Sequence, residues 1–131
     1  MSDAFVVEEV QGLNGARIIA VGVGGGGGNM IGHMLNEGIT GIEMISVNTD
    51  AQVLQNSQST KIQIGAKLTK GLGAGMKPEI GKESALESYD EIRAALDGAD
   101  IVFISAGLGG GTGTGAAPVV AQIAKDRRAH V

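Results

Sequence analysis

Short apolar runs alternate with helical patterns along this chain. Runs rich in isoleucine and valine occupy 17–23, 43–48, 61–64 and 101–106, and such runs are typical of strands buried on both faces of a parallel sheet. Amphipathic or cap-bounded stretches follow them at about 30–37, 51–56 and 78–96, with a last one from 113 to 127 or 128. The alternation predicts an α/β fold, a Rossmann-like parallel sheet with helices on both faces.

Capping and breaking residues set the expected helix bounds. Asn29 is available as a cap for the first helix, and Asp50 precedes the second. The third helix is expected to begin near Pro78, a residue suited to a first helical turn, after a long loop over 65–77. Pro118 is expected near the first turn of the last helix, because a proline further inside removes a backbone hydrogen bond.

Composition narrows the function classes. The chain has 131 residues, enough for one domain, with a net charge of −4, no cysteine and three aromatic residues. A nucleic-acid binder normally has a cationic face and stacking rings, and this chain lacks both. The sequence also lacks a signal-peptide pattern and a long apolar segment, so we expect a cytoplasmic protein that does not insert into a membrane.

Two glycine-rich turns follow the first and fourth predicted strands. They are Gly22-Val23-Gly24-Gly25-Gly26-Gly27-Gly28-Asn29 and Gly107-Leu108-Gly109-Gly110-Gly111-Thr112-Gly113-Thr114-Gly115. The common doubly wound order 3-2-1-4 puts these two strands side by side at the point where open α/β sheets bind ligands. Backbone N–H groups and positive helix ends from both turns would then face one anionic ligand, such as a polyphosphate.

The first turn alone does not distinguish a dinucleotide from another polyphosphate ligand. Gly22, Gly24 and Gly27 fit the dinucleotide fingerprint Gly-x-Gly-x-x-Gly, with Asp50 in the place of the ribose acid, so an NAD(H)-binding Rossmann oxidoreductase is an alternative. No Walker A sequence is present.

The second turn is more specific for phosphate. Its glycines let the main chain bend around phosphate oxygens, and Thr112 and Thr114 supply hydroxyl donors where a helix begins. An ordinary dinucleotide domain has no need of such a turn after its fourth strand.

Four motifs together resemble the tubulin/FtsZ family in content and order. They are Gly24–Asn29, Asn48-Thr49-Asp50-Ala51-Gln52, Gly71-Leu72-Gly73-Ala74-Gly75 followed by Pro78-Glu79-Ile80-Gly81, and Gly109–Gly115 followed by Ala116-Ala117-Pro118. The resemblance covers nearly all of residues 15–125. It implies a GTP-binding GTPase that polymerises head to tail into the filament of the bacterial division ring, where other division proteins join it.

By motif, the resemblance also implies which residues hold GTP or GDP. These are Gly24, Gly25, Gly26, Asn29, Asn48, Asp50, Ala74, Gly75, Gly109, Gly110, Gly111, Thr112, Gly113 and Thr114. Mg²⁺ would bind through the nucleotide, with no direct ligand from the chain. The family usually has Gly-Asn where this chain has Met76-Lys77. If glycine serves a positive φ there, Met76 must strain or re-route the turn, and Lys77 is either a cation near phosphate or a solvated lysine.

The chain ends at Val131, before the strand, the base-binding residues and the hydrolytic acids that follow in the family. We therefore expect the front half of a tubulin/FtsZ-type GTPase domain, with a flexible arm over 1–16 and a partial nucleotide-binding domain over 17–131. In the family the hydrolytic acids come from the adjoining subunit, so no catalytic residue and no activity of the chain alone are expected. The fourth strand would expose an apolar edge that invites self-association. A module without useful nucleotide affinity is a third alternative.

Overall fold

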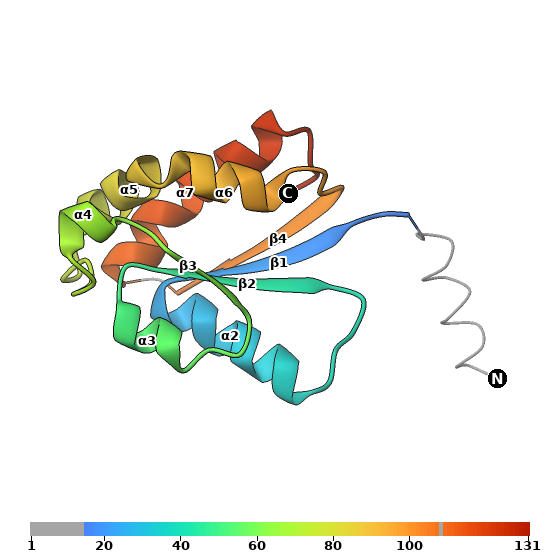
Figure 1. Ribbon diagram of the computed structural model, residues 1–131, viewed down its shortest axis with the longest axis horizontal. Helices are drawn as coiled ribbons and strands as arrows, with labels where there is room; N and C mark the ends of the chain where they lie inside the picture. The colour runs from blue at the N-terminus through green and yellow to red at the C-terminus, as the bar shows by residue number, and fades with distance from the viewer. Residues whose placement is uncertain (1–14, 108) are drawn as a thin grey trace.

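Four parallel strands form one sheet in the order β3-β2-β1-β4. They are β1 (Ile18–Val23), β2 (Glu43–Asn48), β3 (Thr60–Gln63) and β4 (Ile101–Ala106). The computed structural model describes residues 15–107 and 109–131, so most of the predicted arm lies outside the described residues (Figure 1). Val23 pairs with both Val47 and Ala106, so β1, β2 and β4 end at one edge of the sheet. The predicted strand order is confirmed.

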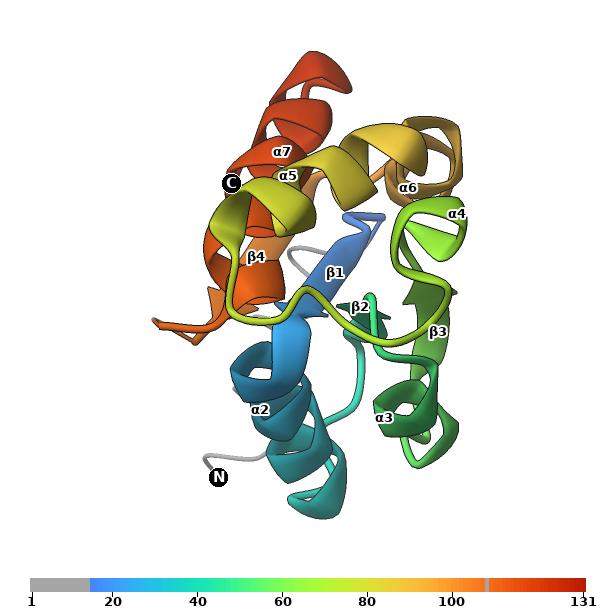
Figure 2. The same ribbon diagram turned by 90° about the vertical axis from the view of Figure 1, so that its left-hand side faces the viewer.

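Helices cover both faces of the sheet, as predicted (Figure 2). One face carries α2 (Gly24–Asn36) and α3 (Ala51–Gln55), and the other carries α5 (Pro78–Glu87), α6 (Tyr89–Leu96) and α7 (Gly111–Asp126). The short helix α4 (Ala66–Thr69) precedes the turn that leads into α5.

The two-residue period of β1 divides the apolar residues between these faces. Ile19, Val21 and Val23 are buried in the larger cluster with side chains of α5, α6 and α7, whereas Ala20 packs with Ile31 of α2.

Glycines let α5 and α7 approach to backbone contact. A methyl group added at Gly115 would overlap with the carbonyl oxygen of Pro78, and one added at Gly81 would overlap with the carbonyl oxygen of Gly111. Neither glycine has a positive φ, so close approach is the reason for glycine at both positions. The N-terminal parts of the two helices are therefore held together through their main chains.

Three predicted helix boundaries are wrong. The first helix, α2, begins at Gly24 and has no side-chain cap, so Asn29 lies inside it and caps nothing. The glycine turn is itself helical, because its glycines allow the helix to lie directly on the sheet. A methyl group at Gly27 would overlap with the carbonyl oxygen of Ser105 in β4.

The region over 65–96 is also more divided than predicted. The expected loop contains α4, and the expected single helix breaks at Ser88, whose hydroxyl accepts a hydrogen bond from the Gly65 N–H at 3.2 Å. The last helix begins at Gly111, which puts Pro118 inside it rather than near its first turn.

The segment after α7 turns and pairs with β4. Arg128 has a φ of +66°, and His130 then forms a parallel bridge with Ile101. The Val102 N–H donates to the His130 carbonyl at 2.7 Å, and the His130 N–H donates to the Asp100 carbonyl at 2.8 Å. A turn therefore follows α7, and a single bridge rather than a strand pairs this end with β4. Phe103 on β4 is 56% exposed, as an apolar edge requires, while self-association stays a prediction.

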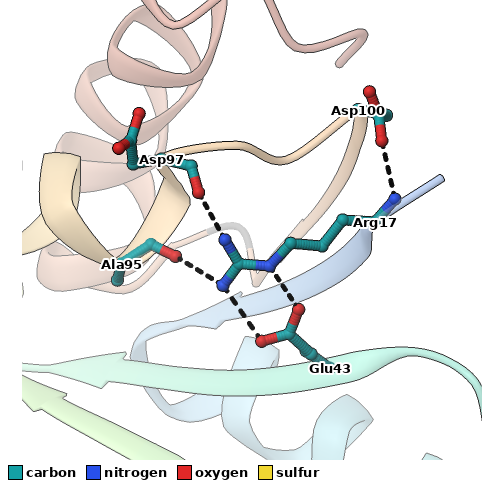
Figure 3. Close-up of polar contacts among 5 residues, drawn as sticks. All are labelled: Arg17, Glu43, Ala95, Asp97 and Asp100. Atoms are coloured by element: carbon teal, nitrogen blue, oxygen red, sulfur yellow. Dashed lines mark hydrogen bonds and ion pairs between the residues drawn. The ribbon is translucent and has the colours of Figure 1, made fainter. Parts of the chain in front are cut away.

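Arg17 ties together the opposite edge of the sheet, where the strands begin (Figure 3). Its Nε lies 2.5 Å from Glu43 Oε2 and its Nη2 lies 3.1 Å from Oε1, while the guanidinium also donates to the carbonyls of Ala95 and Asp97. Its backbone N–H donates to the Asp100 carboxylate at 2.7 Å. The hydrogen bond from Arg17 lowers the pKa of the Glu43 carboxyl below its ordinary value.

Candidate functional site

The two glycine-rich turns meet at the edge where β1 and β4 end. A methyl group added at Gly24 would lie 2.8 Å from the Gly113 nitrogen, and one added at Gly26 would lie 2.9 Å from Gly107 Cα. The two turns are therefore in main-chain contact. The structure places them side by side, as the predicted strand order requires.

A cavity of about 230 Å³ lies between the turns. Its walls are Val23, Gly25, Gly26, Gly107, Gly110, Gly111, Thr112 and Gly113. All of these described residues are uncharged, and six of them are glycines. We call this space the glycine cavity.

Two helices begin at the glycine cavity. Neither α2 nor α7 has a side-chain cap, and neither has an acidic residue in its first turn. The first N–H groups of a helix have no intrahelical acceptor, and the helix dipole adds positive potential at that end. The cavity is therefore suited to an anion that accepts hydrogen bonds from backbone N–H groups.

A second, larger cavity of about 650 Å³ adjoins the first through Gly25. It lies between α2, β2 and α3, and polar side chains such as Asn29, His33, Asn48 and Ser57 line it. Asn29 and Asn48, two of the predicted nucleotide-binding residues, thus face a neighbouring space rather than the glycine cavity. Gly24 and Gly25 also line the larger cavity.

Asp50 makes contacts that hold the local structure together. Its Oδ1 accepts from the N–H groups of Gln52 at 3.0 Å and Val53 at 3.2 Å, which caps α3 as the sequence predicts. Its main chain forms an antiparallel bridge with Leu72. Asp50 therefore holds the loop over 71–77 beside the end of β2.

That loop reaches the glycine cavity from the α5 side. A methyl group added at Gly111 would lie 2.6 Å from the Lys77 nitrogen and 2.9 Å from Ala74 Cβ. The Lys77 N–H donates to the Ala74 carbonyl at 3.1 Å, closing a tight turn in which Gly75 and Met76 have φ of +58° and +62°. Of the two outcomes expected for Met76, strain or a re-routed turn, the structure has the first, a positive φ on a residue with a side chain, and that side chain is 78% exposed.

Two predicted residues of the second turn do not line the glycine cavity. Thr114 is exposed and faces a groove between α5 and α7, because two residues along a helix rotate a side chain to the opposite face from Thr112. Gly109 is exposed with a φ of +89°, which suits the bend before α7.

Sequence reasoning missed Thr49. Its hydroxyl lies 2.7 Å from the hydroxyl of Thr112, and the two residues are 0% and 8% exposed. The only signal in the sequence was its place between the predicted residues Asn48 and Asp50. A hydroxyl pair between residues 63 positions apart is not visible without the fold.

Other kinds of site find no support in the described part of the chain. His33 is exposed and pairs with Glu37 at 3.8 Å. Residues 15–107 and 109–131 contain no group of three His, Cys, Asp or Glu residues placed to hold a metal ion. No helix among them is long and apolar enough to cross a membrane.

The sequence profile of the Tubulin/FtsZ family, GTPase domain, matches residues 17–131. The chain belongs to the tubulin/FtsZ family. Among relatives, it is 57% identical over 120 residues to the cell division protein FtsZ of Wigglesworthia glossinidia brevipalpis, and 58% identical over 120 residues to that of Buchnera aphidicola. Each alignment covers 91% of this chain and 31% of the relative, so the chain spans about a third of the length of these tubulin/FtsZ proteins.

Solved structures of tubulin/FtsZ proteins have the same fold. An empty FtsZ dimer from M. jannaschii matches with a TM-score of 0.87 and 51% identity, over 98% of this chain and 37% of that one. CetZ2 from Haloferax volcanii, described as a GTPγS-bound protofilament, matches with a TM-score of 0.72 and 32% identity, over 81% of this chain and 35% of that one. The predicted family and fold class are both confirmed.

Proposed function

We propose that this chain is the phosphate-binding part of a GTPase domain that binds GTP or GDP. The supporting observation is the glycine cavity, an uncharged space between two uncapped helix N-termini with six glycines in its wall. Phosphate oxygens would accept hydrogen bonds from the main chain of α2 and α7. Family membership favours guanine nucleotide over NAD(H) as the ligand.

Backbone groups allow an acidic chain to hold an anionic ligand. The net charge is −4, and no lysine or arginine lines either cavity among the described residues. Each helix N-terminus contributes roughly 0.3–1 kcal/mol per anionic charge, and more in a partly buried site. Mg²⁺ bound to the nucleotide would neutralise further charge, since it prefers phosphate oxygens and water to an all-protein cage.

The proposed site residues keep distinct roles. Gly25, Gly26 and Gly110–Gly113 form the wall against the phosphates, while Ala74 and Gly75 hold the turn that closes the side next to Gly111. Asn29 and Asn48 approach from the neighbouring cavity. Gly24 provides the main-chain contact between the two turns.

Hydrolysis needs groups that this cavity does not provide. Among the described residues, neither the glycine cavity nor the larger cavity is lined by Asp or Glu. From the resemblance to the family, we propose that the hydrolytic acids come from an adjoining subunit of a head-to-tail filament, the heterologous contact that builds open polymers. The longer protein would act in the cytoplasm at the division site with other division proteins, and this chain alone would turn over GTP negligibly.

Calorimetric titration of the purified chain with GTP, GDP, ATP and NADH tests the ligand. We expect saturable binding of GTP and GDP with Mg²⁺ present, and weaker binding of ATP and NADH. Tighter binding of NADH would replace the proposal with the oxidoreductase alternative. If the chain is folded but binds none of the four, the third alternative, a module without useful nucleotide affinity, would replace the proposal.

Gly110→Val tests the location of the phosphates. Gly110 has φ −88° and ψ 157°, a conformation open to any residue, and a methyl group added there meets no atom within 4 Å. The variant should therefore keep its melting temperature, while a branched side chain in the wall of the glycine cavity should obstruct the phosphates and weaken nucleotide binding. An unchanged affinity for GTP would remove the phosphates from this cavity.

A further inference from the structure

The Thr49–Thr112 hydrogen bond joins two segments at the glycine cavity. Thr49 follows β2 and is fully buried, while Thr112 lies in the first turn of α7 and lines the cavity. Their hydroxyl oxygens are 2.7 Å apart. A methyl group added at Gly24 would lie 3.6 Å from Thr112 Cβ, so the pair sits directly behind the contact between the two glycine turns.

Hydrogen-bond satisfaction favours one direction for this bond. A threonine hydroxyl has one hydrogen to donate and two lone pairs that accept. Among the described residues, Thr112 is the one hydrogen-bond partner of the Thr49 hydroxyl. If Thr112 donated to Thr49, the Thr49 hydrogen would be buried without an acceptor, at a cost of about 1–3 kcal/mol.

The opposite direction pairs the buried Thr49 hydrogen and leaves the Thr112 hydrogen, at the cavity wall, without an acceptor among the described residues. Thr49 then donates to the Thr112 oxygen, and the Thr112 hydrogen is free to turn toward the glycine cavity. A hydroxyl that accepts a hydrogen bond also becomes a better donor, because hydrogen bonds in a chain polarise one another. The pair therefore holds the Thr112 oxygen in place and leaves its hydrogen available as a donor to the glycine cavity.

We propose that Thr49 is a positioning residue for phosphate binding, which orients the Thr112 hydroxyl to donate to a phosphate oxygen of the bound nucleotide. This inference rests on the proposed function. Thr49 does not line the glycine cavity, so it acts only through Thr112. It also lies against the loop over 71–77, since a methyl group added at Gly73 would lie 4.0 Å from the Thr49 hydroxyl oxygen.

A double-mutant cycle on GTP affinity tests this role. Thr49→Val keeps the side-chain shape but removes the hydroxyl, and we expect it to weaken GTP binding about fivefold, the effect of one neutral hydrogen bond. Thr112→Val should weaken binding at least as much. In the Thr112→Val background, adding Thr49→Val should change the affinity by less than about twofold, because the group through which Thr49 acts is gone.

Rescue and control variants separate this role from a structural one. Thr49→Ser retains the hydroxyl and should keep wild-type affinity. Thr60→Val makes the same change of side chain at the start of β3, at a residue that lines neither the glycine cavity nor the larger cavity, and should leave GTP affinity unchanged. The inference would be overturned if Thr49→Val weakened GTP binding by the same factor in the wild-type and Thr112→Val backgrounds. It would also be overturned if Thr49→Val alone bound GTP normally.

A measurement on the unmodified chain covers the case in which Thr49→Val does not fold. In NMR spectra, the Thr112 hydroxyl proton should become protected from exchange on addition of GTP, and the Thr49 hydroxyl proton should stay protected with and without nucleotide. A rapidly exchanging Thr49 proton would overturn the inference. Failure of the wild-type chain to bind any nucleotide would instead overturn the proposed function, so the two failures are distinguishable.

Discussion

Replacing Gly25 with alanine should make the fold more stable and nucleotide binding weaker. Gly25 is the second residue of α2, and a methyl group added there meets no atom within 4 Å. Its φ lies outside the left-handed region, so alanine fits the backbone. Glycine within a helix costs up to about 1 kcal/mol relative to alanine, and we expect a gain of about 0.5–1 kcal/mol in the free energy of unfolding.

The same methyl group would stand in the wall of the glycine cavity. It would hold phosphate oxygens away from the N–H groups at the start of α2, and loss of a hydrogen bond to a charged group costs about 1.5–3 kcal/mol. We therefore expect the Kd for GTP to rise by about tenfold or more. Urea denaturation measures the stability, and calorimetric titration measures the affinity.

Gly32→Ala is the matched control for the helix effect. Gly32 lies two turns further along α2, and a methyl group added there also meets no atom within 4 Å; it lines the larger cavity but not the glycine cavity, where the phosphates are proposed to bind. It should show the stability gain without the loss of affinity. A Gly25→Ala chain that gains stability and binds GTP like wild type would refute the view that this glycine is kept for phosphate.

Three further substitutions test the packing. Gly115→Ala should destabilise the fold by about 3 kcal/mol or more in urea denaturation, because the new methyl group overlaps with the Pro78 carbonyl; a fully stable variant would contradict the observed helix contact. Met76→Gly should raise the free energy of unfolding by about 0.5–1 kcal/mol. Relief of the positive φ outweighs the greater entropy of the unfolded glycine chain, and the exposed Met76 side chain loses little packing. A loss of stability would show that the turn is not strained. Arg17→Met should cost up to about 1 kcal/mol at pH 7, because the pair with Glu43 is partly exposed. The pKa of Glu43 is lowered in the fold, so this stabilisation is present above the unfolded pKa and is lost as the pH falls through the folded one. The difference in stability between wild type and variant should therefore shrink as the pH falls below the unfolded pKa of about 4.3, and parallel curves would contradict the assignment.

Local sequence patterns were sufficient to predict the sheet and the contact between the two glycine-rich turns. Buried isoleucine and valine runs predicted all four strands to within a residue, since a strand covered on both faces needs apolar side chains at nearly every position. The glycine clusters then lay at the ends of β1 and β4 because parallel strands end at one edge.

The features that could not be predicted from the sequence depend on contacts between distant segments. The helical start at Gly24 depends on the close approach of α2 to β4, and the break at Ser88 coincides with its bond to Gly65. Helix propensity describes neither contact. Thr49 and Thr112 likewise became a pair only through the fold, because each motif on its own gives no sign of the other.

The main-chain contacts of α7 couple the glycine cavity to the outer edge of the sheet. The first residue of α7, Gly111, is held between the Lys77 backbone and Gly81 of α5, so this end of the helix has no free volume in which to move alone. A ligand that shifts the Lys77 turn must carry α5 and α7 as one body. Because the far end of α7 leads into the pairing of His130 with β4, one helix connects the glycine cavity to the outer edge of the sheet.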